Sequence, residues 1–368
     1  MRMDHGGDIY EMPVRLDFSV SINPSGMPDS LKKAVISSSG AWEQYPDIRQ
    51  RKLKSYAARW YAGHGMPVPE DWFLFGNGAS GLLYALMAGL KPAKVLIPVP
   101  SFGEYRETAE AAGAEVCRIY LPESSDFSLR GGLSEIEKAL EAGDIDLMIL
   151  GNPNNPTGSC ITALEAEKLA DACRKTGTVL VADECFGWFL HNREQYSMLP
   201  SVLARPDSFS HVIILESLTK ICAMPGIRLG YLIAPDSGIR GRIRHVMQPW
   251  AVSAPAEAAG CEAFSGCLDI CAQNARSILS HERGRLSDAL EGLGCRVIPS
   301  EVNYILFRCG PEYGNLKKRC LSRGILIRSC SSSDGPGEGY YRVAVKSPQE
   351  NDEMIMTLRK IHGEKNYG

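Results

Sequence analysis

Short apolar runs rich in valine, isoleucine and leucine recur between residues 72 and 234, and stretches typical of helices separate them. Continuous apolar runs of this length are typical of strands that are buried on both faces of a mostly parallel sheet. The alternation therefore predicts a large, three-layer α/β domain with helices on both sides of the sheet. The predicted strands are WFLFG (72–76), KVLIPVP (94–100), DLMILG (146–151), TVLVADE (178–184), HVIILES (211–217) and RLGYLIA (228–234).

The pattern changes in the last third of the chain. A long helical stretch, NARSILSHERGRLSDALEGLG, precedes the predicted strands VNYILFRC, ILIRSC and YYRVAV, and a last helix begins at Ser347 with proline at its first helical position. This order indicates a smaller α+β domain. We expect residues 41–250 to form the large domain, and residues 1–40 together with 251–368 to form the small, discontinuous one.

Charge and composition exclude several classes of protein. Lys and Arg number 40 against 43 Asp and Glu, a net charge of −3, so nucleic acid or an anionic membrane is not expected as a partner. The N-terminus lacks a signal-peptide core and no apolar run approaches membrane-spanning length, so we expect a cytoplasmic protein. The 12 cysteines are scattered along a chain of 368 residues, which favours reduced thiols over disulfides or a metal site.

One motif points to a rival chemistry. GNGASG (76–81) matches the G-x-G-x-x-G fingerprint of dinucleotide-binding proteins and lies between a predicted strand and a helical run. The next strand has no acidic residue at its tip to bind a ribose hydroxyl, because Glu104 comes only after the turn. Hydride transfer is therefore disfavoured, but glycine-lined backbone N–H groups at a helix start still suit a phosphate.

Polar motifs follow several of the predicted strands. Alone, GNPNNPTG (151–158) reads as a turn, Asp183 as a helix cap, and Lys220 of ESLTK as a charge after a strand. Ligands of α/β sheets bind at the carboxyl ends of strands, where all these motifs lie. Pyridoxal 5′-phosphate needs such a set, namely a lysine for its Schiff base, a carboxylate at its ring nitrogen, phosphate donors and a flat group on its ring. The candidates are Lys220, Asp183, the Gly78–Ser80 loop with Ser217 and Arg228, and Phe102.

The order of these motifs resembles a known family. N-P-x-N-P-T-G, D-E, S-x-T-K and P-G-x-R-x-G follow one another as in fold-type I pyridoxal-phosphate enzymes, and more narrowly as in the histidinol-phosphate aminotransferase group. Within that group the chain is most similar to the decarboxylases of small O-phosphorylated amino acids. The closer resemblance covers essentially the whole chain and rests on His5-Gly6-Gly7, INPSGMP (22–28), MPGIRLGYL (224–232), MQPW (247–250), ILIRSC (325–330) and YYRVAV (340–345).

The resemblance implies a role for each cofactor residue. Lys220 would bind the cofactor covalently, Asp183 would pair with its ring nitrogen, and Asn155 would bond its 3-oxygen. Phe102 would stack on the ring, and Tyr45 would reach the phosphate from the second subunit of a homodimer. The remaining phosphate contacts implied are Gly78, Ala79, Ser80, Ser217, Thr219 and Arg228. The chain departs from many relatives at Phe186, where they have a tyrosine that bonds the 3-oxygen.

The resemblance also implies a substrate site. Arg342 would bind the substrate α-carboxylate, and His5, Asn23 and Arg328 would surround a substrate phosphate, with Asn155 also in contact. The leading hypothesis is decarboxylation of L-threonine O-3-phosphate to (R)-1-amino-2-propanol O-2-phosphate for cobalamin biosynthesis.

Three alternatives stay open at this point. The same residues could transaminate histidinol phosphate or a related amino acid, because the orientation of the bound substrate separates the two reactions. L-Serine O-phosphate lacks only one methyl group, which a pocket distinguishes by about 1–3 kcal/mol. A regulatory module built on this fold is disfavoured, because no helix-turn-helix segment is predicted.

Overall fold

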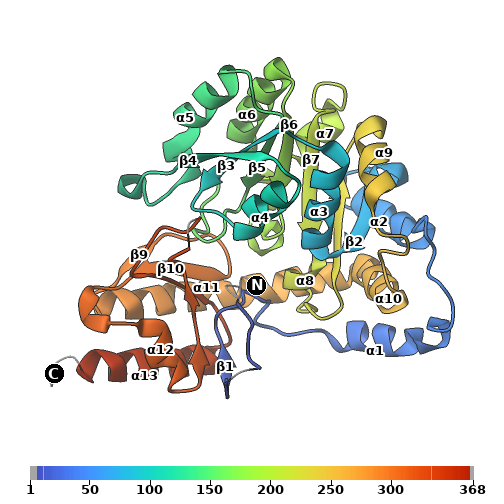
Figure 1. Ribbon diagram of the computed structural model, residues 1–368. Coiled ribbons are helices and arrows are strands. Elements are labelled where there is room, and N and C mark those ends of the chain that lie inside the picture. Colours follow the sequence, from blue (N-terminus) through green and yellow to red (C-terminus); the bar gives the residue numbers. More distant parts are fainter. Residues whose placement is uncertain (1–5, 11, 333, 365–368) are drawn as a thin grey trace.

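The computed structural model describes residues 6–10, 12–332 and 334–364. Its centre is a seven-stranded sheet with the order β2-β8-β7-β6-β5-β3-β4 (Figure 1). All its strands run in one direction except β8, which is antiparallel to both of its neighbours. The fold prediction is therefore confirmed. The strands are β2 (Phe73–Asn77), β3 (Lys94–Val99), β4 (Glu115–Tyr120), β5 (Leu147–Gly151), β6 (Val179–Asp183), β7 (Val212–Ser217) and β8 (Leu229–Ile233).

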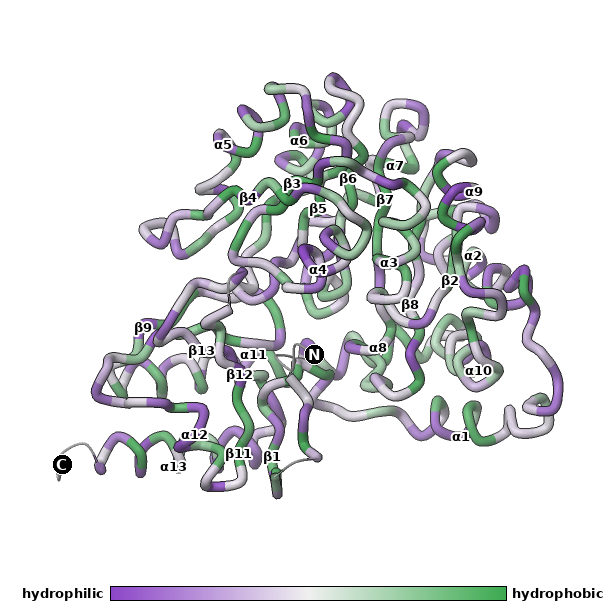
Figure 2. The backbone as a smooth tube through the Cα atoms, viewed as in Figure 1, coloured by the Kyte–Doolittle hydropathy of each residue, from purple (hydrophilic) through white to green (hydrophobic). Residues whose placement is uncertain are grey.

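The inner strands of this sheet are buried on both faces: alternate side chains of a strand point to opposite faces, and both sets are covered. In β5, Leu147 and Ile149 enter one hydrophobic core, and Met148 and Leu150 enter the other. The tube in Figure 2 is green along these central strands, whereas outer helices such as α9 are partly purple. One core is closed by α3 (Gly78–Leu90), α4 (Gly103–Ala111) and α9 (Ser237–Val246), and the other includes α2 (Arg51–Gly63), α5 (Leu129–Glu141), α6 (Ala163–Thr176), α7 (Leu199–Ala204), α8 (Leu218–Ile221) and α10 (Ala254–Glu262).

The strand β4 was not predicted from the sequence. It lies at the edge of the sheet next to β3, and its side chains are half-buried or exposed rather than buried. Its sequence EVCRIY includes Glu115 and Arg118 and lacks the continuous apolar run of the inner strands. A strand whose side chains are only partly buried does not need a continuous apolar sequence. This explains why β4 was not predicted.

A second, four-stranded antiparallel sheet has the order β12-β13-β10-β9. The N-terminal segment joins this region, because Leu16 and Asp17 (β1) pair in parallel with β11. The division into domains at residues 40 and 250 stays a prediction. The remaining elements are α1 (Asp29–Ser37), α11 (Leu268–Gly292), β9 (Arg296–Ile298), β10 (Tyr304–Arg308), α12 (Leu316–Leu321), β11 (Ile325–Leu326), β12 (Arg328–Ser329), β13 (Tyr340–Ala344) and α13 (Pro348–Gly363).

Two helix starts follow their sequence signals. Thr162 forms a capping box with Glu165 at the start of α6, as predicted, and Ser347 does the same with Glu350 ahead of Pro348 in α13. Across the described ranges, no helix is both long and apolar enough to cross a membrane.

The outer edge of β2 is closed by a side chain instead of another strand. Gln50, which is only 8% exposed, donates from Nε2 to the carbonyl of Phe75 at 2.7 Å and accepts from the N–H of Phe75 at 3.0 Å. The side-chain amide of Gln50 thus makes the two hydrogen bonds to Phe75 that a further strand would otherwise make at this buried edge of the sheet. Because β2 leads into α3, this contact also supports the start of that helix.

Replacing Gln50 with alanine should destabilise the protein. The change leaves a buried N–H and a buried C=O of Phe75 without partners, which costs roughly 2 kcal/mol or more of unfolding free energy. Urea denaturation followed by circular dichroism measures the loss. The exposed Gln44→Ala serves as the matched control. Equal midpoints for the two variants would show that the amide does not hold this edge.

Candidate functional site

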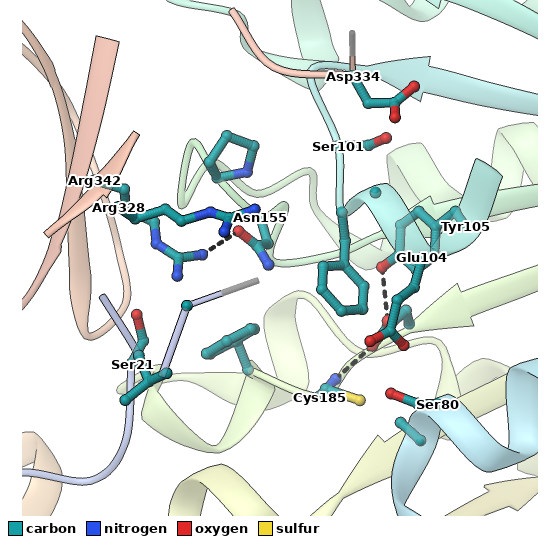
Figure 3. Close-up of a pocket in the computed structure, with 18 of the residues that line it drawn as sticks. Ser21, Ser80, Ser101, Glu104, Tyr105, Asn155, Cys185, Arg328, Asp334 and Arg342 are labelled. Atoms are coloured by element: carbon teal, nitrogen blue, oxygen red, sulfur yellow. Dashed lines mark hydrogen bonds between the residues drawn. The ribbon is translucent and has the colours of Figure 1, made fainter. Parts of the chain in front are cut away.

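A cavity of about 310 Å³ opens at the carboxyl ends of the inner strands β5, β6 and β7. Its volume suits a small ligand or cofactor. Figure 3 shows several of its side chains converging from both sheets. The cavity brings together most of the residues predicted from the sequence, which are Ala79, Ser80, Phe102, Asn155, Asp183, Ser217, Thr219, Lys220, Arg228, Arg328 and Arg342.

Lys220 projects from a tight turn that directly follows β7. Ser217 caps the short helix α8 by accepting from the N–H of Thr219, and their hydroxyls are 2.6 Å apart. The carbonyl of Lys220 accepts from the N–H of Asn23 at 3.0 Å. These bonds to Ser217 and Asn23 fix the backbone of the turn, and so they fix the position from which the Lys220 side chain enters the cavity.

The surroundings of Lys220 favour its neutral amine. Burial lowers the pKa of Lys220 below its ordinary value of 10.5, and the nearby guanidinium groups of Arg342 and Arg228 lower it further. Burial and like charges both disfavour the ammonium form. A lysine that loses its proton easily is suited to act as a nucleophile or a base.

Asp183 ends β6 and faces the cavity with its carboxylate held by two donors. The hydroxyl of Tyr105 donates to Oδ2 at 2.6 Å, and the N–H of Cys185 donates to Oδ1 at 3.0 Å (Figure 3). Burial raises the pKa of the Tyr105 hydroxyl, so it stays protonated and remains a donor. These bonds fix the direction in which Asp183 can meet a cationic group.

Tyr105 was not predicted from the sequence as a residue of the site. Tyr105 lies in the first turn of α4, three residues after Phe102, which precedes the helix with an extended backbone. The two rings meet edge to face with centroids 5.6 Å apart. Glu104 was also missed as a cavity residue, and its buried Oε2 has no hydrogen-bond partner among the described residues.

The ends of β6 and β7 are anchored on the side away from the cavity. Glu184 and Glu216, which neighbour Asp183 and Ser217 in the chain, both form ion pairs with Arg193. Trp188 also donates to Glu216 at 2.9 Å. Burial raises the pKa of both carboxyls, and the Arg193 guanidinium beside them acts in the opposite direction.

Gly78 and Arg228 fit together at the start of α3. Gly78 has φ +70°, and a Cβ added there would lie 2.7 Å from Nη2 of Arg228. No side chain caps this end of α3, so the first backbone N–H groups, including those of Ala79 and Ser80, stay available for an anion. With the hydroxyls of Ser80, Ser217 and Thr219, they form a set of donors typical of a phosphate site.

The opposite wall of the cavity is cationic. Arg328 and Arg342 are direct neighbours across β12 and β13, so their side chains start from the same face of the sheet. Arg342 is only 9% exposed, donates to Oδ1 of Asn155 and to the carbonyl of Ser19, and leaves a buried Nε without a partner. No carboxylate of the described chain forms an ion pair with it, which suits a guanidinium that binds an anionic ligand.

Asn23 does not reach this cavity. Its Nδ2 donates to the carbonyls of Ile221 and Cys271 at 2.6 and 2.9 Å, and its Oδ1 accepts from the N–H and hydroxyl of Ser25. All polar atoms of this side chain are therefore hydrogen-bonded within the protein. The prediction that Asn23 contacts a substrate phosphate is wrong. The structure assigns Asn23 to the support of the Lys220 turn.

Two other predicted residues lie apart from the cavity. His5 is outside the described residues, although the next residue, Gly6, lines the cavity. Tyr45 is 78% exposed and stacks on the exposed Trp250 with centroids 4.2 Å apart. Its predicted role in a second subunit stays a prediction.

The donor set fits the cofactor predicted from the sequence. A phosphate matches the uncapped end of α3 with Arg228, a cationic ring nitrogen matches Asp183, and a flat ring matches Phe102. Lys220, a buried amine of lowered pKa, lines the same cavity. Phe186 also lines it and brings no hydroxyl, which leaves Asn155 as the predicted partner for the 3-oxygen.

Comparisons with known proteins agree with this geometry. A family model described as aminotransferase class I and II matches residues 14–358. The threonine-phosphate decarboxylase of Salmonella typhimurium is 36% identical over 367 residues, which cover 97% of this chain and 96% of that protein. The adenosylcobalamin biosynthesis bifunctional protein CobDQ of Leptospira interrogans is 27% identical over 97% of this chain and 41% of its own length. The solved histidinol-phosphate aminotransferase of Clostridium acetobutylicum superposes with a TM-score of 0.84 at 26% identity, over 95% of this chain and 99% of that one.

Competitive labelling should find Lys220 neutral at a lower pH than an ordinary lysine. In the protein freed of bound small molecules, acetylation of Lys220 should have a pH midpoint below 10.5, with the exposed Lys33 as internal reference. Arg342→Gln removes a nearby cation, so it should move the midpoint to higher pH. A midpoint at or above 10.5 in the unaltered protein would contradict the inferred environment.

Proposed function

The chain belongs to the aminotransferase class I and II family, and on that premise we propose that it is a pyridoxal-phosphate-dependent decarboxylase of L-threonine O-3-phosphate. The product is (R)-1-amino-2-propanol O-2-phosphate, a building block for cobalamin. The observation that carries the proposal is the pair of arginines, Arg328 and Arg342, side by side on the wall of the cavity that also holds Lys220. The substrate has two anionic groups, and these two guanidiniums suit a carboxylate and a phosphate. The 36% identity to the Salmonella decarboxylase along nearly all of both chains supports the same reading.

The cofactor, when bound to Lys220, supplies an electron sink for the bond that breaks at the substrate Cα. The protein supplies position and charge. Asp183, fixed by Tyr105 and the N–H of Cys185, holds a positive charge on the ring nitrogen. The start of α3, Ser217 and Arg228 bind the cofactor phosphate.

The substrate site decides which bond breaks. Arg342 binds the α-carboxylate, and Arg328, with His5, binds the substrate phosphate. Two anchors at opposite ends of a small molecule set its rotation, and that rotation selects between loss of CO₂ and loss of the Cα proton. Lys220, with its lowered pKa, would be suited to move a proton at the substrate Cα.

The active form is proposed to be a homodimer. Tyr45 is exposed, stacks on Trp250 and does not line the cavity of its own chain. An exposed pair of large aromatic rings is typical of an interface. In the dimer, Tyr45 reaches the cofactor phosphate of the partner subunit.

A direct assay separates decarboxylation from transamination. The protein loaded with pyridoxal 5′-phosphate should release CO₂ steadily from L-threonine O-3-phosphate in the absence of any keto acid. L-Serine O-phosphate, tested alongside, should react more slowly by roughly tenfold or more for the missing methyl group. Lys220→Ala should abolish both turnover and the visible absorbance of the lysine-bound cofactor. Glutamate formed from histidinol phosphate only with 2-oxoglutarate, without CO₂ release, would make the enzyme an aminotransferase.

Arg328→Gln tests the phosphate site. Losing one charged partner should raise KM for L-threonine O-3-phosphate by about tenfold or more, while the affinity for the cofactor stays close to that of the unaltered enzyme. The control is Arg308→Gln, which changes an arginine of the same sheet outside the cavity. An unchanged KM in Arg328→Gln would remove this arginine from substrate binding.

A further inference from the structure

Two buried cysteines face each other far along the chain from the catalytic lysine. Cys295 precedes β9, Cys309 follows β10, and their sulfur atoms are 3.4 Å apart. Cys295 and Cys309 are each only 6% exposed. Neither residue lines the cavity that holds Lys220, so the pair is separate from the proposed active site.

The strand register makes the two cysteines direct cross-strand neighbours. Arg308 pairs with Arg296 in the antiparallel ladder of β10 and β9, so the next position on each strand pairs Cys309 with Cys295. The N–H of Cys309 donates to the carbonyl of Gly339 at 3.0 Å, on the β13 side. In an antiparallel strand the N–H and C=O of one residue point to the same side, so towards β9 this position is not hydrogen-bonded.

That position has the spacing that a disulfide requires. Cα atoms of a non-hydrogen-bonded antiparallel pair lie about 4.5 Å apart, and disulfides span Cα separations of about 4.4–6.8 Å. The N–H of Cys295 is bonded to the carbonyl of Leu290 at the end of α11 instead of to β10. The register thus favours a disulfide, and the two sulfur atoms, 3.4 Å apart, have to move closer together to bond.

A small oxidant can approach the pair from outside. Cys309 lines a second cleft of about 790 Å³, which lies between the loop after β10, α12 and the start of β13. Cys295 does not line this cleft, so Cys309 is the member of the pair that a reagent in the cleft approaches first.

We propose that Cys295 and Cys309 form a redox-active thiol pair that closes into an intramolecular disulfide on exposure to a peroxide. The Cys309 sulfur attacks the peroxide and becomes a sulfenic acid, and hydrogen peroxide releases one water. The Cys295 sulfur then displaces that oxygen as a second water, which leaves an S–S bond. Two thiols lose two electrons and two protons, and the peroxide takes up both.

The bond would link β9 to the end of β10 and stabilise the smaller sheet. A cross-link that closes a short loop stabilises a protein mainly by restricting its unfolded chain. Since both sulfur atoms lie outside the cavity, turnover should be little changed. The pair would protect the fold under oxidising conditions without stopping the enzyme.

The test uses the full-length, cofactor-loaded protein and hydrogen peroxide. After brief oxidation, remaining thiols are alkylated and the protein is digested and examined by mass spectrometry. We expect a cross-linked peptide that contains Cys295 and Cys309, that disappears with dithiothreitol and that is absent from Cys309→Ser and Cys295→Ser. The oxidised protein should also melt a few degrees higher than its reduced form, and the two serine variants should show no such rise.

Cys117→Ser provides the matched control, because Cys117 is more exposed than either member of the pair and lies in another sheet. This variant should still form the cross-link. If Cys295 and Cys309 are instead recovered as thiols, or as sulfinic acids without a cross-link, at peroxide levels that oxidise Cys117, the proposal is wrong. The readout does not use the enzyme's substrate, so failure of the proposed reaction leaves this test intact.

Discussion

The site depends on one constraint, which is that the inner strands of the central sheet are buried on both faces, so a ligand can reach them only where the strands end. The strands β5, β6 and β7 run in parallel, and their register sets Gly151 beside Asp183 and Asp183 beside Leu215. The loops that follow these strands must therefore emerge next to one another. Asp183, the loop with Asn155 and the turn with Lys220 are far apart in the sequence. The parallel register alone is enough to bring them to one place.

The sequence predicts this arrangement well where the pattern is strong. Inner strands leave continuous apolar runs, and the motifs at their ends can be placed at one edge once the strands are known to be parallel. The half-buried edge strand β4 leaves no such run. Contacts such as Tyr105 with Asp183 join residues that are distant in the chain, so no local pattern of the sequence predicts them. The true direction of the Asn23 side chain, towards Ile221 and Cys271, depends on tertiary packing that no local pattern encodes.

The N-terminal segment links the two sheets at the site. Its Asn23 bonds the turn that carries Lys220, and the carbonyl of Ser19 accepts from Arg342. Burial lowers the pKa of the Arg342 guanidinium, and no carboxylate among the described residues forms an ion pair with it. Buried cations of this kind are costly unless they are bonded. Carbonyl and amide oxygens hold the guanidinium in place and leave its charge for a ligand.

The Arg228 guanidinium fills the space that a side chain at position 78 would need, and both residues have positive φ angles, of +70° for Gly78 and +64° for Arg228. A side chain at position 78 would collide with the guanidinium, and an arginine in the left-handed region is kept there only by what surrounds it. Any residue other than glycine at position 78 would therefore require the Arg228 guanidinium to move away from the position in which it is proposed to bind the cofactor phosphate. A library of variants at either position should for this reason vary the two positions together.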